Sequence, residues 1–260
     1  MHSPEQLKIY YKELHNQFPF SDYIKSKNFG SVYKTIASVA NKYLEQGDKI
    51  LDFGCGPCDK TGMLQKMGFQ CVGYDDLGDG WHSLDDNIKK INFFADQVGI
   101  DFVINKDELD QYNNFNMIML TDVIEHFHDS PKNILIDLLG KLKVNGILLI
   151  TVPNAGNIRK RISLLFGKTN YPPYHEFYWN KGSWRGHIRE YVYGDLELLA
   201  KYLDLECLQI SGVDHMLHRL PNLFRPFYLL ISYLFPSLKD SWVLVCRKKD
   251  IEPPKRNYIS

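Results

Sequence analysis

Several features that mark secreted, membrane-spanning or nucleic-acid-binding proteins are missing from this sequence. The five cysteines form no disulfide framework, and the first residues contain no apolar signal core. Lysines plus arginines equal aspartates plus glutamates at 31 each, so no net charge attracts nucleic acid. The apolar stretch 220–238 is interrupted by charge and proline, and is too short for the roughly 20 residues of a membrane span. We therefore expect a cytoplasmic protein in a reducing compartment, with no membrane span and no nucleic-acid partner.

The chain is large enough to bury one full hydrophobic core. Its 260 residues are 44% hydrophobic, which suits a single α/β domain with elaborations rather than two independent domains. Around this domain, residues 1–260, we expect an N-terminal arm at 1–29, a cap insertion at 155–193 and an apolar insertion at 216–240.

A buried-strand pattern at residues 49–53 contains an acid and is followed by two glycines and a helix pattern. Gly54 and Gly56 let the backbone turn and approach a ligand, and the next helix offers free N–H groups. A dinucleotide fingerprint needs a third glycine where this chain has Asp59, and the carboxylate of Asp52 would repel a pyrophosphate. The pattern favours a ligand with an ammonium group, with an NAD site or a structural turn as the alternatives.

The run ILDFGCGP, residues 50–57, resembles motif I of the class I S-adenosylmethionine (SAM) methyltransferases. Cys58 stands where that family often has a third glycine. Cys55 and Cys58 also spell a redox C-x-x-C motif, but no thioredoxin-like frame surrounds them, and we favour small residues in a tight loop. The resemblance implies that four residues hold the methionine end of SAM: Asp52, Gly54, Cys55 and Gly56.

Further polar residues follow the second, third and fourth strand patterns. Asp75 and Asp76 end the run 70–76, and an acid there can accept hydrogen bonds from both hydroxyls of a ribose. The spacing between Gly54 and Asp75 suits any nucleoside cofactor. The resemblance also implies that an acid after the third strand, Asp107 rather than Asp96, meets the adenine. The apolar run 115–120 delivers Thr121 and Asp122 at its carboxyl end, where doubly wound sheets bind ligands.

The run DVIEHFHD, continued by LKVNGILLITVPN, resembles the methyltransferase branch that contains ubiquinone-pathway and many sugar O-methyltransferases. The resemblance implies a doubly wound, Rossmann-like, seven-stranded mixed sheet with the order 3-2-1-4-5-7-6, under a helical and aromatic substrate cap. It also implies that an N-terminal arm lies over the cofactor.

Methyl transfer to an alcohol requires a base that removes the hydroxyl proton. We favour His187 or His126 as this catalytic base. His126, His128 and Asp129 also invite a metal interpretation, but satisfied histidines are the commoner case, and we expect no metal.

Cations and aromatic residues alternate through the insertion 155–193. Such a surface can stack a base or sugar and bind phosphates, while a solvated aromatic cap is the simpler explanation. The substrate-binding residues that we predict here are Arg159, Tyr178, Trp179, Arg185 and Arg189.

These observations favour a SAM-dependent O-methyltransferase that acts on a sugar hydroxyl, nucleotide-activated and used in surface polysaccharide biosynthesis. The apolar stretch 220–238 favours a quinone or lipid phenol methyltransferase instead, and it also predicts a homodimer or a packed cap. An NAD oxidoreductase and a non-catalytic nucleoside-binding protein are disfavoured by the carboxylate of Asp52 and by the abundance of candidate bases.

Overall fold

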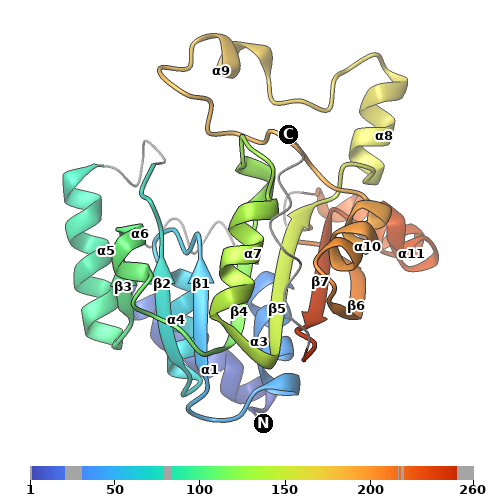
Figure 1. Ribbon diagram of the computed structural model, residues 1–260. Coiled ribbons are helices and arrows are strands. Elements are labelled where there is room, and N and C mark those ends of the chain that lie inside the picture. The colour runs from blue at the N-terminus through green and yellow to red at the C-terminus, as the bar shows by residue number, and fades with distance from the viewer. Residues whose placement is uncertain (1, 21–30, 79–83, 216, 218–219, 251–260) are drawn as a thin grey trace, which may run out of the picture.

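A mostly parallel sheet forms the centre of the molecule in a computed structural model (Figure 1). The structure describes residues 2–20, 31–78, 84–215, 217 and 220–250. The strand order β3-β2-β1-β4-β5-β7-β6, with β7 antiparallel to both neighbours, confirms the predicted order and fold class. The strands are β1 (Lys49–Phe53), β2 (Gln70–Tyr74), β3 (Asp101–Val103), β4 (Phe115–Thr121), β5 (Leu142–Pro153), β6 (Glu206–Val213) and β7 (Ser241–Arg247).

Helices cover both faces of the sheet, because strand side chains alternate between two apolar layers. Ile50 and Leu51, neighbours on β1, belong to different layers. The layer of Ile50 packs on α1, α3, α4 and α5, and the layer of Leu51 packs on α6, α7 and α10. These helices are α1 (Pro4–Gln17), α3 (Ser31–Tyr43), α4 (Asp59–Lys66), α5 (Asp85–Val98), α6 (Lys106–Leu109), α7 (Lys132–Lys141) and α10 (Tyr193–Tyr202).

Helix α5 is a regular helix of 14 residues between β2 and β3. Ile91, Phe94 and Ala95 give it a buried face, and Gly99 ends it in a left-handed conformation with φ 78°.

The N-terminal arm contributes a core helix. Leu14 and Phe18 are buried against the α3 and α4 side of the sheet, and Ser3 and Gln6 form a capping box at the start of α1. Residues 21–30 lie outside the described part of the chain, so the proposed lid over the cofactor stays a prediction.

The carboxyl edge of the sheet carries the remaining elements, α8 (Ile158–Leu165), α9 (Tyr174–Tyr178) and α11 (Arg225–Leu234). The segment with α8 and α9 follows β5 and rises above this edge, while α11 connects β6 to β7 (Figure 1). Within the described residues, no helix is long and apolar enough to cross a membrane.

Candidate functional site

The loop between β1 and α4 is held against the end of β2. The N–H groups of Gly54 and Cys55 donate to the carbonyl of Tyr74, at 2.7 and 3.0 Å. Gly54 has φ 76°, and a Cβ there would lie 2.6 Å from Cγ2 of Val123. Both the left-handed backbone and the close approach therefore require glycine at this position.

Asp75 joins this loop to the one after β2. Its Oδ2 accepts a hydrogen bond from the N–H of Gly56, and its Oδ1 accepts one from Leu77, both at 2.8 Å. Each carboxylate oxygen has further lone pairs, so the same group can still accept ribose hydroxyls.

A cavity of about 560 Å³ opens beside this loop, between the ends of β1, β2 and β4. Phe53 and Tyr74 stack in its wall with ring centroids 4.9 Å apart, and Leu109 and Leu138 add apolar surface. Its size and mixed lining suit a nucleoside ligand. It gathers these predicted residues: Gly54, Cys55, Gly56, Asp75, Asp76, Thr121, Asp122, His126 and Arg185.

Two predicted cofactor residues do not line this cavity. Asp52 is fully buried beneath the loop, where it accepts a 2.6 Å hydrogen bond from Oγ1 of Thr61, and burial raises its pKa to about 6. Asp107 is exposed in the first turn of α6. Lys60, which sequence analysis did not single out, does line the cavity, and its Nζ donates to the carbonyl of Thr121 at 3.3 Å.

Both cysteines of the loop are buried thiols. Their sulfur atoms lie 3.6 Å apart, and burial raises the pKa of Cys55 well above its ordinary value. The protonated thiol is a weak nucleophile, so these contacts fit small packing residues better than a redox pair. Cys58 has φ 64°, the left-handed conformation that glycine adopts most easily.

Asp122 is strained at the carboxyl end of β4. It has φ 59°, which is uncommon for a residue with a side chain, and its N–H donates to the carbonyl of Thr151 at 2.9 Å. The hydroxyl of Thr151 donates to Oδ1 of Asp122 at 3.1 Å. These contacts with β5 hold the strained residue in place, with its carboxylate at the cavity wall.

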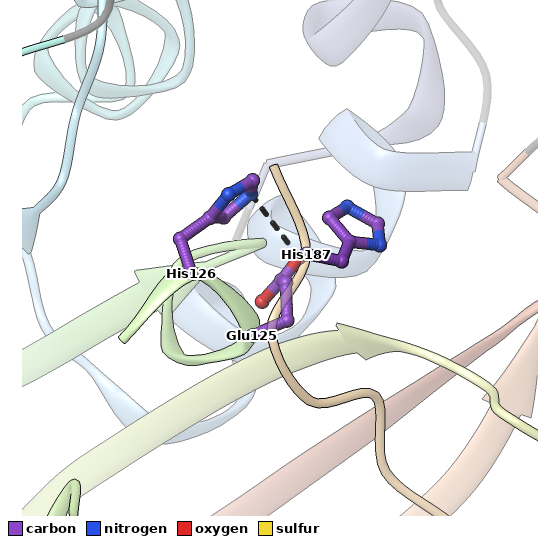
Figure 2. Close-up of side chains that lie close together, drawn as sticks. All are labelled: Glu125, His126 and His187. Carbon is purple, nitrogen blue, oxygen red and sulfur yellow. Dashed lines mark ion pairs between the residues drawn. The ribbon is translucent and has the colours of Figure 1, made fainter. Parts of the chain in front are cut away.

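The two predicted bases lie next to each other beside this cavity, together with Glu125 (Figure 2). The rings of His126 and His187 pack edge to face, with their centroids 4.9 Å apart, and Nε2 of His126 lies 3.9 Å from Oε1 of Glu125. Hydrogen-bonding atoms of all three lie within 4.8 Å of one another, and an acid with two imidazoles is a donor set that could hold a divalent metal.

The cap brings these residues together by lying along the loop after β4. Nδ1 of His126 lies 2.7 Å from the carbonyl of Arg185, and the N–H of Ile188 donates to the carbonyl of Glu125 at 2.7 Å. Nε2 of His128 lies 2.5 Å from the carbonyl of Trp184. His128 therefore holds the cap, and it is not part of the cluster that gathers around His126.

Burial sets the protonation of the cluster. Glu125 is fully buried, neither of its carboxylate oxygens has a hydrogen-bond partner among the described residues, and burial with Asp122 nearby raises its pKa to about 8. Burial and His126 lower the pKa of His187 to about 4, so His187 is neutral at neutral pH. Nδ1 of His187 lies 2.9 Å from Oε1 of Glu190, and Glu190 also pairs with Lys160. Because Nδ1–H donates to this carboxylate, Nε2 keeps the lone pair that can accept a proton.

Comparison with known proteins identifies the kind of molecule that has this site. A family model described as "Methyltransferase domain" matches residues 25–210. The chain belongs to this family. The sheet order, the glycine loop and the cavity thus belong to a class I SAM-dependent methyltransferase, an enzyme whose cofactor is SAM. No curated protein matches the chain.

Solved structures share the fold at low sequence identity. The 1,6-didemethyltoxoflavin-N1-methyltransferase of Burkholderia thailandensis, solved with S-adenosylhomocysteine, is 15% identical with a TM-score of 0.54, over 96% of this chain and 92% of that one. A SAM-dependent methyltransferase of Archaeoglobus fulgidus is 16% identical with a TM-score of 0.51, over 92% and 100%. TehB of Haemophilus influenzae is 15% identical with a TM-score of 0.55, over 88% and 66%.

The cavity of this methyltransferase fits the cofactor. The left-handed glycines leave room for a ligand against the backbone, Asp75 offers acceptors to a ribose, and the walls beside it are aromatic and apolar. Gly54, Gly56, Asp75 and Asp122 are the residues that would hold the group.

The predicted acceptor-binding residues of the methyltransferase are spread across the cap. Arg185 reaches the cavity and pairs with Asp76 at 3.3 Å. Arg189 pairs with Asp195 instead, Arg159 is exposed on α8, and neither lines the cavity. Tyr178 and Trp179 are exposed in the ring cluster of α9. The structure thus brings only Arg185 of this set to the cofactor site.

His215 is a polar residue of this edge that the sequence pattern gave no reason to select. It follows β6, and both ring nitrogens are buried without a hydrogen-bond partner in the described part of the chain. Burial lowers its pKa, while the charge of Asp122 acts in the opposite direction. A neutral imidazole here offers one donor and one acceptor near Asp122.

Proposed function

We propose that this methyltransferase transfers the methyl group to a hydroxyl oxygen of a small-molecule acceptor, and that His187 removes the proton, with His126 as the alternative base. The observation that carries the proposal is the neutral His187, held by Glu190 beside His126 and the cavity. When bound, SAM supplies a methyl group on a sulfonium that is already a good leaving group. The chain must then orient the acceptor and accept its proton, and a neutral imidazole does the second.

The acceptor that we favour is a sugar, nucleotide-activated and destined for a surface polysaccharide. Support comes from the cap, whose cations and aromatic rings suit phosphates and sugar faces, and from Arg185 at the cavity. A quinone or lipid phenol is the second candidate, since α11 exposes a row of large apolar side chains near the same edge. The oxygen nucleophile separates this proposal from nitrogen methylation, which the toxoflavin enzyme performs on its own substrate.

A labelled-methyl assay tests the acceptor class. The purified chain is incubated with SAM carrying an isotope-labelled methyl group and with nucleoside diphosphate sugars, hydroquinones or secondary amines. Methyl chemical shifts in the NMR spectrum then distinguish O-methyl from N-methyl products. We expect O-methyl products from the sugars. Products from amines alone would contradict the proposal, and products from hydroquinones alone would favour the second candidate.

A further inference from the structure

Helix α11 presents an apolar stripe to solvent. Phe227, Leu230, Tyr233 and Leu234 recur at helical spacing and are all exposed, Tyr233 at 80% of its surface. Ser232, on the opposite side, is buried. Leu223 and Phe224 before the helix and Phe235 after it extend the exposed surface. Contiguous apolar surface of this kind normally marks an interaction site.

Helix α8 adds a second exposed apolar segment on the same side of the molecule. Ile162, Leu164, Leu165 and Phe166 are exposed, Leu165 at 84%. The side-chain amide of Asn154, just before α8, donates to the carbonyls of Ser237 and Lys239, just after α11. The charge of Arg159 also acts on Tyr228 of α11. We call α8, α11 and their flanking residues 158–168 and 222–239 the α8–α11 face.

The α8–α11 face itself contains cations and no acid. No Asp or Glu occurs in residues 158–168 or 222–239, while cations occur at Arg159, Lys160, Arg161, Lys168 and Lys239, among others. Two acids beside the face are already bonded to it, Glu190 to Lys160 and Asp214 to the hydroxyl of Tyr228. Exposed apolar residues bordered by cations are typical of helices that lie in the surface of an anionic bilayer.

The same charges argue against a second copy of the chain. In a symmetric dimer the same patch meets itself, so exposed cations such as Arg159, Arg161 and Lys168 of two α8–α11 faces would approach each other, and neither face contains an acid of its own. A helix of 10 residues is also only about 15 Å long, half of the roughly 30 Å hydrocarbon core, so α11 can lie in the interface and cannot span it.

We propose that the α8–α11 face binds the surface of a membrane that contains anionic lipids. Helix α8 follows the carboxyl end of β5 and α11 follows that of β6, so the face lies at the sheet edge that carries the cavity. Binding would place the methyltransferase site next to the lipid surface, where the second acceptor candidate of the proposed function, a quinone or lipid phenol, can reach it. This differs from the homodimer that the apolar stretch predicted.

Vesicle sedimentation of the full chain tests the proposal. The probes are vesicles of phosphatidylcholine alone and of phosphatidylcholine with phosphatidylglycerol. We expect the chain to sediment with the anionic vesicles, and less at high salt because headgroup attraction is screened. The double variant Phe227→Ser, Leu230→Ser should bind at least tenfold more weakly. A matched control is Phe93→Ser, Leu198→Ser, which removes two exposed apolar side chains from α5 and α10 and should bind like the wild type.

Three readouts keep the result interpretable. S-adenosylhomocysteine affinity and melting temperature show that the variants are folded, and the dependence of wild-type binding on lipid composition tests the proposal without any variant. Failure of the wild type to sediment with either vesicle would overturn it. Light scattering that finds a dimer, dissociated by the α11 variant and not by the control, would assign the face to a second copy of the chain instead.

Discussion

At the scale of single residues, the proposed O-methylation depends on the side chain that can accept a proton. His187 has its Nδ1 on Glu190 and a lowered pKa, so it is unprotonated over the whole neutral range. We expect His187→Ala to reduce turnover by about 100-fold or more, because general base catalysis is lost. Calorimetry should find unchanged affinity for S-adenosylhomocysteine. His175→Ala removes the exposed histidine of α9 and is the control, and full activity of His187→Ala would transfer the role to His126.

The raised pKa of Glu125 predicts how the stability of the folded chain changes with pH. Its pKa rises from an ordinary 4.5 to about 8 in the folded chain, so between these values the folded chain keeps a proton that the unfolded chain has lost. The free energy of unfolding therefore falls as pH rises through this window, by roughly 2 kcal/mol between about pH 6.5 and 8. His187 does not contribute there, since its effect lies between about 4 and 6.5.

Replacing Glu125 by Gln should remove the loss of stability that occurs as pH rises. Thermal melts at about pH 6.5 and 8.5 should show a decrease of several degrees for the wild type and a smaller one for Glu125→Gln. An equal decrease in both proteins would mean that Glu125 is ionised in the folded chain.

Asp75 and Asp107 give opposite expectations although both were predicted to bind the cofactor. Asp75→Ala should weaken S-adenosylhomocysteine binding by roughly 1.5 to 3 kcal/mol, because it removes charged hydrogen bonds and the link between two loops. Asp107→Ala should leave the Kd unchanged, since Asp107 is exposed outside the cavity lining. An unchanged Kd for the first variant would refute the ribose role.

At the scale of elements, the loop after β1 requires two properties of Gly54, a left-handed φ and the absence of a Cβ. Gly47→Ala tests backbone strain alone, because φ is 84° there and a Cβ would meet nothing within 4 Å. We expect Gly47→Ala to cost about 1 kcal/mol of stability, and Gly54→Ala to cost more and to weaken cofactor binding severely. Equal costs with normal binding would show that the loop is not held against Val123.

At the scale of the whole molecule, the sequence was sufficient for the sheet and for most of the cofactor corner. Apolar runs such as 115–120 are buried on both faces, and motif I places Gly54 and Gly56. What could not be predicted depends on contacts between distant segments. Glu125 meets His187 only because the cap crosses the loop after β4, and the sequence gives no spacing for that contact. Asp52 matched its motif, yet packing buries it under the loop.

The sequence predicted which kinds of residue the cap contains, but it did not predict how the cap folds. Its aromatic residues do gather, as in the contact of Tyr178 with Trp179, but they lie in an exposed cluster instead of the cavity wall. Arg185 is the exception, because its pair with Asp76 crosses to the end of β2.

If the glycine loop and Asp75 form a SAM site, S-adenosylhomocysteine should raise the melting temperature of the chain. S-adenosylhomocysteine at 100 times its Kd should stabilise the chain by about 2.7 kcal/mol, and the Asp75→Ala variant should need a higher concentration for the same effect. NAD at equal concentration should have no effect. Stabilisation by NAD without stabilisation by S-adenosylhomocysteine would show that this loop binds a dinucleotide and not SAM.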